Sequence, residues 1–313
     1  MDEKKEVPHS QSRFLQQRLP ACHPRFSPCV SSIFYLAISV ISLIFAICYL
    51  LANQDLFEVV TRYDDVCDGK ATCQVTVHFD KDIKSQLFVY YELSKFYQVN
   101  FMYTSSKSWK QLEGEFVEES DLKKCNPLLK DSNDIVYAPC GTVPLSVFND
   151  TFQFDSKLPK FTDEGITIPS IWKFFKQTNE KYPKAGAWLD NNTLFEDGQQ
   201  NERFVNWIQT AAFPKFRKLW AKTSNDVDIP KGDYVVTITN NFPVSSFKGT
   251  KSIVFTETSW TGGRNMFLPY FFFVVFGVSF AISIILAILY FTNAFPLYKA
   301  IANNDSPLHK KML

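Results

Sequence analysis

The chain has 313 residues, of which 33 are Lys or Arg and 32 are Asp or Glu, so its formal net charge is +1. A chain this close to neutral argues against the strongly basic surface that binds nucleic acid. Its 31 Phe, 13 Tyr and 6 Trp are expected to lie mainly in a packed core.

The first predicted element, after a polar N-terminal tail of residues 1–29, is a membrane-spanning helix over residues 30–52. The run Phe26–Gln54 contains no Asp, Glu, Lys or Arg, and about 20 apolar residues cross a hydrocarbon core of roughly 30 Å. A cleaved signal peptide is the alternative interpretation, because arginines precede the run. The apolar stretch is longer than the roughly 7–15 residues typical of a signal peptide, and no clean cleavage site follows. We therefore predict an uncleaved membrane anchor.

Residues 53–266 are long enough to fold around a core of their own. Two kinds of pattern predict strands near both ends of this stretch. Gln74–Asp80 alternates between apolar and polar residues, and Gln86–Leu93 is rich in residues that favour strands. Asp233–Thr239 and Lys251–Thr258 repeat the pattern near its end. We expect the strands of the two ends to pair, which would bring the ends of the domain together.

The middle of this domain gives weaker signals. Phe204–Trp220 has apolar residues at helical spacing, interrupted at Pro214, and predicts a helix. Lys157–Gln200 has little periodicity and is expected to run over the surface. Together these patterns predict a membrane protein in which two transmembrane α-helices bracket a large, β-rich α+β ectodomain.

Four of the seven cysteines lie between the two apolar runs: Cys67, Cys73, Cys125 and Cys140. An even number of cysteines in an oxidising compartment is typical of disulfide bonds. Their order favours the pairs Cys67–Cys73 and Cys125–Cys140, although four cysteines permit three pairings. A zinc site is disfavoured, because His78 is the only histidine of this stretch and no C-x-x-C pair is present.

Two glycosylation sequons lie in the predicted ectodomain. Asn149 and Asn191 each begin an N-x-[ST] triplet and are the predicted glycosylation sites. Asn304 begins a third triplet in the C-terminal tail, where it is expected to stay unmodified. The contrast between these positions makes the membrane topology testable.

The second membrane-spanning helix is predicted over residues 267–295, within the uncharged run Met266–Tyr298. The short tails outside the two spans, residues 1–29 and 296–313, carry lysines and arginines. Short basic flanks stay in the cytosol, whereas long loops cross the membrane largely regardless of charge. Both termini are therefore predicted to be cytosolic and the ectodomain lumenal or extracellular.

The sequence carries no recognised catalytic, cofactor-binding or metal-binding motif, and we predict that the chain is not an enzyme. A Ser-His-Asp or Cys-His site would have to use His78, whose alternating strand suits a structural role. G-x-S-x-G, H-E-x-x-H and phosphate-loop motifs are absent. Two alternatives stay open: a free-standing receptor or adhesion domain, and a glycan-acting ectoenzyme built on a carboxylate pair.

Five segments, in order along nearly the whole chain, resemble the Cdc50/Lem3 family. Their motifs are F-x-Q-Q-x-L-P-A-x-x-P, Y-Y-x-L-x-x-F-Y-Q, P-C-G with F-N-D-T-F, F-R-K-L, and W-x-G-G-x-N just before the second span. The segments are Phe14–Pro24, Phe88–Gln98, Pro139–Phe152, Phe204–Trp220 and Asn241–Asn265. Thr142–Pro144 departs from the usual apolar stretch, so the local backbone there is expected to differ.

The resemblance implies a function. Family members are non-catalytic accessory (β) subunits of P4-type ATPases, the flippases that move phospholipid from the exoplasmic to the cytosolic leaflet. It implies a heterodimer in which the catalytic partner holds the ATP and Mg²⁺ sites and this chain binds no cofactor. It further implies a role in ER exit, stability and the transport cycle of the ATPase, in Golgi, endosomal or plasma membrane. The sequence specifies neither the ATPase nor its lipid nor the organelle.

The resemblance also selects candidate contacts with the ATPase. They are Gln16, Gln17, Leu19, Pro20, Arg217, Trp260, Gly262, Gly263 and Asn265. For the N-terminal residues, an ordered tail without a partner is the alternative. Gly262 and Gly263 are expected rather to shape a turn, since glycine takes positive φ. For Arg217 the alternative is an ion pair inside the ectodomain.

Overall fold

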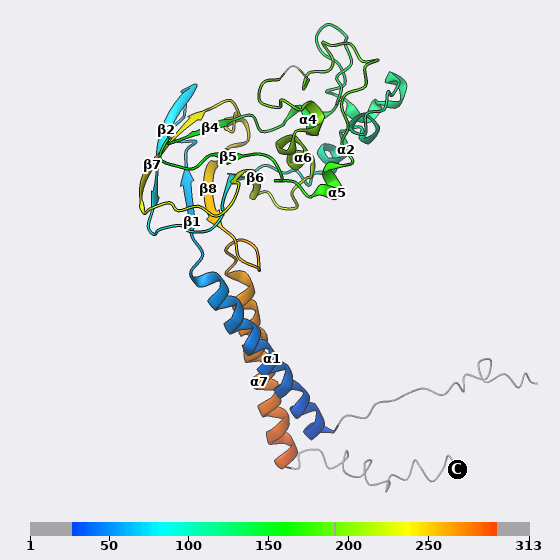
Figure 1. Cartoon of the computed structure of the whole chain (residues 1–313). Coiled ribbons are helices and arrows are strands. Elements are labelled where there is room, and N and C mark those ends of the chain that lie inside the picture. The colour runs from blue at the N-terminus through cyan, green and yellow to red at the C-terminus, as the bar shows by residue number, and fades with distance from the viewer. Residues whose placement is uncertain (1–26, 191, 293–313) are drawn as a thin grey trace, which may run out of the picture. The chain divides into compact units, whose positions relative to one another are not determined.

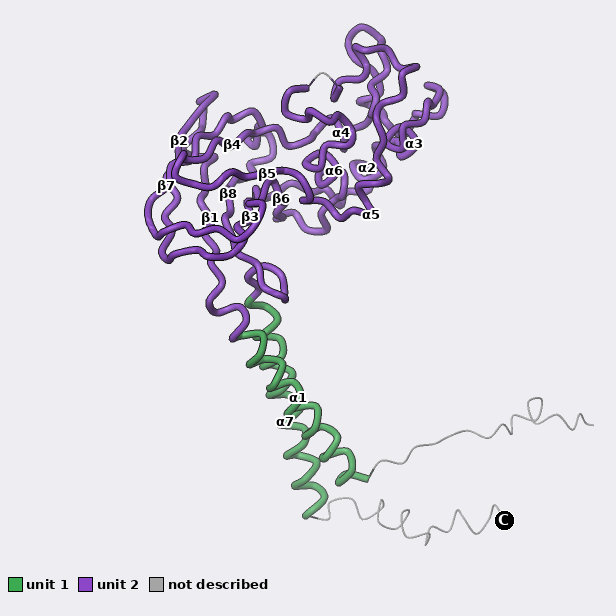
Figure 2. The backbone as a smooth tube through the Cα atoms, in the orientation of Figure 1, with its two compact units in different colours: residues 1–50, 266–313 green, residues 51–265 purple. Residues whose placement is uncertain are grey.

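The computed structural model describes residues 27–190 and 192–292. The chain divides into two compact units, which Figure 2 distinguishes by colour. One is helical and combines residues 1–50 with 266–313, and the other is the ectodomain, residues 51–265.

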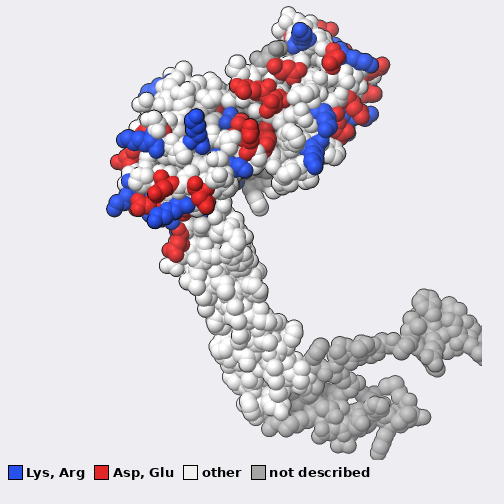
Figure 3. Space-filling view, in the orientation of Figure 1, with Lys and Arg blue, Asp and Glu red and all other residues white. Residues whose placement is uncertain are grey.

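The helical unit consists, in its described part, of two long apolar helices. Helix α1 spans Pro28–Gln54 and helix α7 spans Phe267–Phe291 (Figure 1). Helix α1 is longer at both ends than the expected 30–52, while residues 293–295 of the second predicted span lie outside the described residues. Neither helix contains a charged residue, and the helical part is white in Figure 3 for that reason. At about 1.5 Å per residue, each is long enough to cross a bilayer core.

The two helices of this unit are joined along small polar residues. Ser283 Oγ donates to the backbone oxygen of Ser32 at 2.9 Å, and Ser32 Oγ donates back to the oxygen of Ser283 at 2.9 Å. Ser39 and Ser279 are also buried in the unit. Small residues of this kind allow close approach of membrane helices, and their hydroxyls hydrogen-bond within the seam.

Two antiparallel sheets form the first part of the ectodomain. The five-stranded sheet has the order β1-β8-β3-β6-β5 and the three-stranded sheet has the order β2-β7-β4. The strands are β1 (Glu58–Arg62), β2 (Thr72–Phe79), β3 (Leu87–Leu93), β4 (Thr151–Phe154), β5 (Phe161–Thr162), β6 (Phe216–Thr223), β7 (Gly232–Thr239) and β8 (Lys251–Glu257). Pairing of β1 and β3 with β8, and of β2 with β7, confirms that strands from the two ends meet.

The two sheets pack face to face through aromatic side chains. Strand β2 alternates strictly between exposed and buried residues, so that Phe79 points inward. Its ring lies 5.6 Å from that of Phe255 on β8, and the ring of Phe255 lies 5.8 Å from that of Phe154 on β4. Strand β8, between β1 and β3, is buried along its whole length. The core of this part therefore lies between the sheets, as in a β-sandwich.

The helix predicted over Phe204–Trp220 is wrong in its second half. Helix α6 covers only Glu202–Ile208, and residues Phe216–Thr223 form strand β6, which pairs with β3. The register shifts opposite Val89 and Tyr90, so Trp220 is an extra residue on β6. Because this bulge changes which residues face inward, the buried positions of the strand follow an apparently helical spacing.

The second part of the ectodomain consists of short helices and well-packed loops. Its helices are α2 (Phe101–Ser105), α3 (Trp109–Leu112), α4 (Thr142–Leu145) and α5 (Pro169–Trp172), together with α6. The expectation that Lys157–Gln200 runs over the surface is wrong in part, because Phe175, Leu189 and Phe195 belong to the core. Turns and 3₁₀ segments bury these residues without giving the sequence a regular period.

Disulfide bonds lie in both parts of the ectodomain. Cys67 is bonded to Cys73 at the beginning of β2, and Cys125 is bonded to Cys140 just ahead of α4. This is the pairing that the order of the cysteines favours. Cys125 and Cys140 are buried in a small cluster of their own, with Val117 and Leu122.

Candidate partner interface

The four family-like segments of the ectodomain meet around one core. The ring of Tyr91, from Phe88–Gln98, stacks on that of Phe148, from Pro139–Phe152, with centroids 3.8 Å apart. Trp207 Nε1 donates to the backbone oxygen of Val143 at 2.8 Å, which ties α6 to α4. The ring of Phe148 also lies 5.4 Å from that of Phe242. The fifth segment, Phe14–Pro24, lies outside the described residues, as do the candidate contacts Gln16, Gln17, Leu19 and Pro20.

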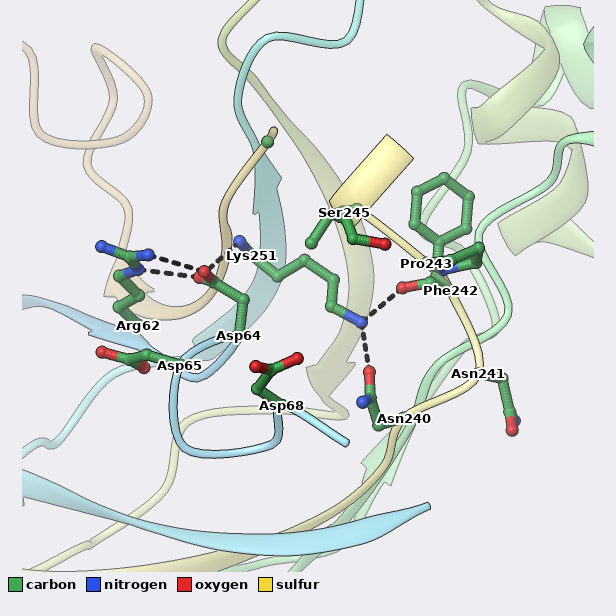
Figure 4. A pocket seen from close by; sticks show the side chains of 12 residues that line it. Arg62, Asp64, Asp65, Asp68, Asn240, Asn241, Phe242, Pro243, Ser245 and Lys251 are labelled. Atoms are coloured by element: carbon green, nitrogen blue, oxygen red, sulfur yellow. Dashed lines mark hydrogen bonds and ion pairs between the residues drawn. The ribbon is translucent and has the colours of Figure 1, made fainter. Parts of the chain in front are cut away.

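A buried ion pair lies where these segments meet. The Nζ of Lys251 is 2.7 Å from Oδ2 of Asp150, and both side chains are almost fully buried. The same Nζ donates to Oδ1 of Asn240 at 2.5 Å and to the backbone oxygen of Phe242 at 2.6 Å (Figure 4). A lysine ammonium has three N–H donors, so this one is fully hydrogen-bonded.

The carboxylate of Asp150 is equally well satisfied. The backbone N–H groups of Asn241 and Phe242 each donate to its Oδ1 at 2.6 Å, and the hydroxyl of Tyr63 donates to its Oδ2 at 2.8 Å. Burial, followed by the charge of Asp150, raises the pKa of Tyr63 well above its usual value, so the hydroxyl keeps its proton. The cluster joins the ends of β1 and β4 to the loop before β8. It leaves no polar group available for catalysis and acts as a structural link.

A polar cavity of about 550 Å³ lies beside this cluster, and three aspartates, at positions 64, 65 and 68, line it (Figure 4). Asp64 accepts from Arg62 Nη2 at 2.7 Å and from the backbone N–H of Lys251 at 2.9 Å. Desolvation raises the pKa of Asp64, but these hydrogen bonds outweigh it, and the pKa lies below its usual value. A glycosidase acid requires a raised pKa. Asp64 therefore does not have the properties of the acid in a glycan-acting ectoenzyme.

Arg217 forms ion pairs inside the ectodomain. Its Nε donates to Glu92 Oε2 at 2.8 Å and its Nη1 donates to Glu58 Oε2 at 2.9 Å. Burial lowers the pKa of Arg217, but the two carboxylates raise it more, so the guanidinium remains charged. Arg217 thus forms the ion pair inside the ectodomain that the sequence offered as the alternative, and its contact with the ATPase stays a prediction.

The loop between β8 and α7 contains the last group of candidate contacts. The backbone groups of Ser259 and Gly262 exchange hydrogen bonds of 2.8 and 2.9 Å, and Gly262 has φ +96°. The φ of Gly263 lies outside the positive range that favours glycine. The backbone N–H of Asn265 donates to Oδ1 of Asn53 at 2.9 Å, which joins the end of the ectodomain to its beginning. Trp260 is 78% exposed on this loop.

Asn149 is the sequon residue that lies within the described part of the chain. Asn149 is half-buried, and its backbone oxygen accepts from Nδ2 of Asn241 at 3.1 Å. Within the described part of the chain, its Oδ1 is buried without a hydrogen-bond partner. Asn191 and Asn304 lie outside the described residues.

Sequence reasoning missed the buried ion pair and an exposed apolar segment around α2. Lys251 is the first residue of a strand, and a charge at that position is usually read as exposed. Its partner, Asp150, lies 101 positions away within a sequon triplet. No local signal joins the two. The exposure of this segment was not predicted, because large apolar residues such as Tyr97, Phe101 and Met102 are usually expected in a core.

Comparison with known proteins identifies the family. A sequence profile of the LEM3 (ligand-effect modulator 3) family / CDC50 family matches residues 33–295. ALA-interacting subunit 3 of Arabidopsis thaliana is 33% identical, over 89% of this chain and 85% of that protein. The phospholipid-transporting ATPase accessory subunit LEM3 of Saccharomyces cerevisiae is 30% identical over 82% and 77%, and cell cycle control protein 50A of Mus musculus is 29% identical over 88% and 87%. The chain therefore belongs to the LEM3/CDC50 family.

Proposed function

We propose that this chain is a non-catalytic accessory subunit of a P4-type ATPase that moves phospholipid from the exoplasmic to the cytosolic leaflet. The family match over residues 33–295 carries the proposal, because it takes in most of helix α1, all of helix α7 and the whole ectodomain. The name of the yeast relative, an accessory subunit of a phospholipid-transporting ATPase, supports it.

The polar groups of the ectodomain support a role without catalysis. The ammonium of Lys251 and the carboxylate of Asp150 are saturated by neighbouring groups. His78 lies on the open surface of β2, with Nδ1 2.6 Å from Oδ1 of Asp233. ATP and Mg²⁺ are proposed to bind to the catalytic partner and not to this chain. An ectodomain that binds one state of the ATPase cycle more tightly than another would shift their populations.

The proposed topology places both termini in the cytosol and the ectodomain in the lumen or outside the cell. The disulfides Cys67–Cys73 and Cys125–Cys140 support this assignment, since such bonds persist in oxidising compartments. Asn149 and Asn191 are the proposed glycosylation sites on that side. The complex is proposed to leave the ER for Golgi, endosomal or plasma membrane, with the chain needed for export of its partner.

The test is purification of the tagged full-length chain from native membranes in mild detergent, with identification of the large proteins that accompany it. We expect a near-stoichiometric P4-type ATPase, with lipid-stimulated ATP hydrolysis that is lost when the chain is omitted. The control is the same chain expressed without an ATPase, which should remain in the ER. Export of the chain alone, with no ATPase bound, would contradict the proposal and favour a free-standing receptor.

A further inference from the structure

A polar cavity of about 500 Å³ lies next to the residue at which helix α1 ends. The charged residues that line this juxtamembrane cavity are Asp55, Glu58, Asp80, Lys81 and Arg264. They come from the segment after α1, the turn after β2 and the loop before α7, and all of them belong to the ectodomain unit. The volume lies within the range of small-molecule sites, about 300–1,000 Å³.

The place of this cavity along the chain puts it at the level of the lipid headgroups. The apolar run of the first span ends at Ala52, and Gln54, which also lines the cavity, follows within the same helix. Two helical residues rise about 3 Å, whereas the headgroup layer on each side of the hydrocarbon core is about 5–8 Å thick. Arg264 stands shortly before α7, and the N–H of Asn265 donates to Asn53 Oδ1 at 2.9 Å. Both spans therefore leave the hydrocarbon core close to this cavity.

Some of the charged groups in the juxtamembrane cavity are already paired within the ectodomain. Lys81 Nζ lies 3.1 Å from Oε2 of Glu257 and also donates to the backbone oxygen of Asp55. Oε2 of Glu58 accepts from Nη1 of Arg217 at 2.9 Å. These two side chains of the lining therefore contribute little net charge to a ligand.

The other charged groups of the cavity are exposed and available. Within residues 27–190 and 192–292, no hydrogen bond or ion pair engages the guanidinium of Arg264 or the carboxylates of Asp55 and Asp80. A guanidinium binds phosphate through two parallel N–H···O bonds, and a carboxylate accepts hydrogen bonds from an ammonium group. One cation beside two anions thus complements a ligand that carries a phosphate and an ammonium group close together. A zwitterionic phospholipid headgroup has this composition.

We propose that the juxtamembrane cavity binds the headgroup of one zwitterionic phospholipid from the leaflet on the ectodomain side. Its phosphate binds to Arg264, and its ammonium group binds to Asp55 and Asp80. Phosphatidylserine binds less tightly, because its additional carboxylate meets the same two aspartates, and such like-charge contacts generate specificity.

A soluble phosphate ester offers the same polar groups as the lipid. It is disfavoured because the bilayer holds headgroups next to the cavity at a high effective concentration, which a soluble molecule lacks. A protein segment is the other class of occupant, and the same argument disfavours it. The inference goes beyond the proposed function, since the site is complete in this chain without an ATPase.

The test is native mass spectrometry of the purified full-length chain in detergent, without an ATPase, after addition of phosphatidylethanolamine or phosphatidylserine. We expect one phosphatidylethanolamine per chain, and at least about threefold weaker retention of phosphatidylserine, the scale of an exposed charge contact. Soluble phosphoethanolamine, the third ligand, should bind at least about tenfold more weakly than the lipid. Equal retention of the two lipids, or equal binding of the soluble ester, would overturn the proposal.

Substitutions give an independent measurement. Arg264→Gln should lower retention of phosphatidylethanolamine at least about fivefold, because the charge-assisted hydrogen bonds to phosphate are lost. Lys173→Gln, which removes an exposed cation elsewhere, is the control and should change retention by less than about twofold. Wild-type retention by Arg264→Gln would overturn the proposal.

The two aspartates provide a test that loss of folding cannot imitate. Asp55→Asn combined with Asp80→Asn should weaken phosphatidylethanolamine and strengthen phosphatidylserine, so the preference between the lipids should fall towards one. Thermal unfolding of each variant verifies that it folds. A preference that persists in this double variant would contradict the assigned roles of Asp55 and Asp80. Because these samples contain no ATPase, failure of the lipid site leaves the proposed accessory function untouched.

Discussion

At the scale of single residues, Asp150 and Lys251 form a buried ion pair that links several segments of the ectodomain. Their ion pair is 2.7 Å long and inaccessible to solvent, and each partner is hydrogen-bonded to neighbouring groups as well. A buried pair of this kind gains little over a well-packed apolar pair, but loss of one partner leaves an uncompensated charge. The pair therefore specifies which segments meet and strongly penalises other arrangements.

Asp150→Asn should lower the free energy of unfolding of the ectodomain by about 3–5 kcal/mol, because Lys251 would lose its carboxylate partner in a buried site. The measurement is thermal unfolding of the full-length protein in detergent, followed by tryptophan fluorescence. Asp134→Asn is the control, since Asp134 pairs with Lys130 while 84% exposed. It should cost less than about 1 kcal/mol. Equal midpoints for the two variants would show that the buried pair does not hold these segments together.

Gly141 is a second residue whose identity the structure explains. It has φ +108°, and an added Cβ would lie 2.2 Å from the backbone oxygen of Ser106. A backbone oxygen next to a helix cannot move aside as a flexible side chain can. The P-C-G segment therefore requires glycine for space as well as for backbone conformation.

Gly141→Ala should sharply reduce the yield and the unfolding temperature of the protein, with a cost of at least about 2 kcal/mol from strain and overpacking. Gly263→Ala is the matched control, because no atom lies within 4 Å of its added Cβ. The control should behave as the wild type in the same melting experiment. A Gly141→Ala protein of normal stability would mean that α4 shifts to make room.

At the scale of elements, helix α6 ends against strand β6 through Lys218. The Nζ of Lys218 donates to the backbone oxygens of Asn206, at 2.7 Å, and Gln209, at the carboxyl end of α6. Cations stabilise this end of a helix because of its partial negative charge. Desolvation, with a smaller contribution from the charge of Lys107, nevertheless lowers the pKa of Lys218 from 10.5 to about 8.

Stability should therefore rise with pH through the titration of Lys218. Below about pH 8 the folded and unfolded chains both hold the proton, and the cost of burying the charge is fully present. Between about pH 8 and about pH 10 the unfolded chain keeps the proton while the folded chain releases it, so the folded state gains. Unfolding temperature against pH should show this rise in wild type and in Lys173→Met, an exposed control. Its persistence in Lys218→Met would assign the rise to other groups.

At the scale of the whole molecule, the two compact units differ in the side chains that they carry. The helical unit has only uncharged side chains on α1 and α7 and suits the membrane interior. Among the described residues, the ectodomain carries the charged side chains, the disulfides and the candidate partner surface. This division follows from the solvents that surround the two units, since a charged side chain is costly at the centre of a bilayer.

Glycosylation should report the topology of the whole chain. In a eukaryotic host, the wild-type protein should lose mass on endoglycosidase treatment, and Asn149→Gln and Asn191→Gln should each remove part of that shift. Asn304→Gln is the control and should leave the shift unchanged, because oligosaccharide is transferred only on the lumenal side. A shift that disappears with Asn304→Gln alone would place the C-terminal tail in the lumen and contradict the proposed topology.

Much of this architecture was predictable because it depends on local patterns. The uncharged runs have a length that fits a bilayer, and the alternation in β2 and β7 corresponds to one buried face. The family-like segments and the order of the cysteines extended these predictions to the function and to the disulfides. All of this information lies within a few neighbouring residues at a time.

The sequence by itself thus determined the two spans, the β-rich class of the ectodomain and the family. Tertiary structure decided that Phe216–Thr223 is a strand, because pairing with β3 and a bulge at Trp220 override the local spacing. It also decided that Lys251 meets Asp150 and that Phe101 stays exposed. Contacts between residues 101 positions apart leave no periodic trace. The sequence alone does not distinguish a large apolar residue that is buried in the core from one that is exposed on the surface.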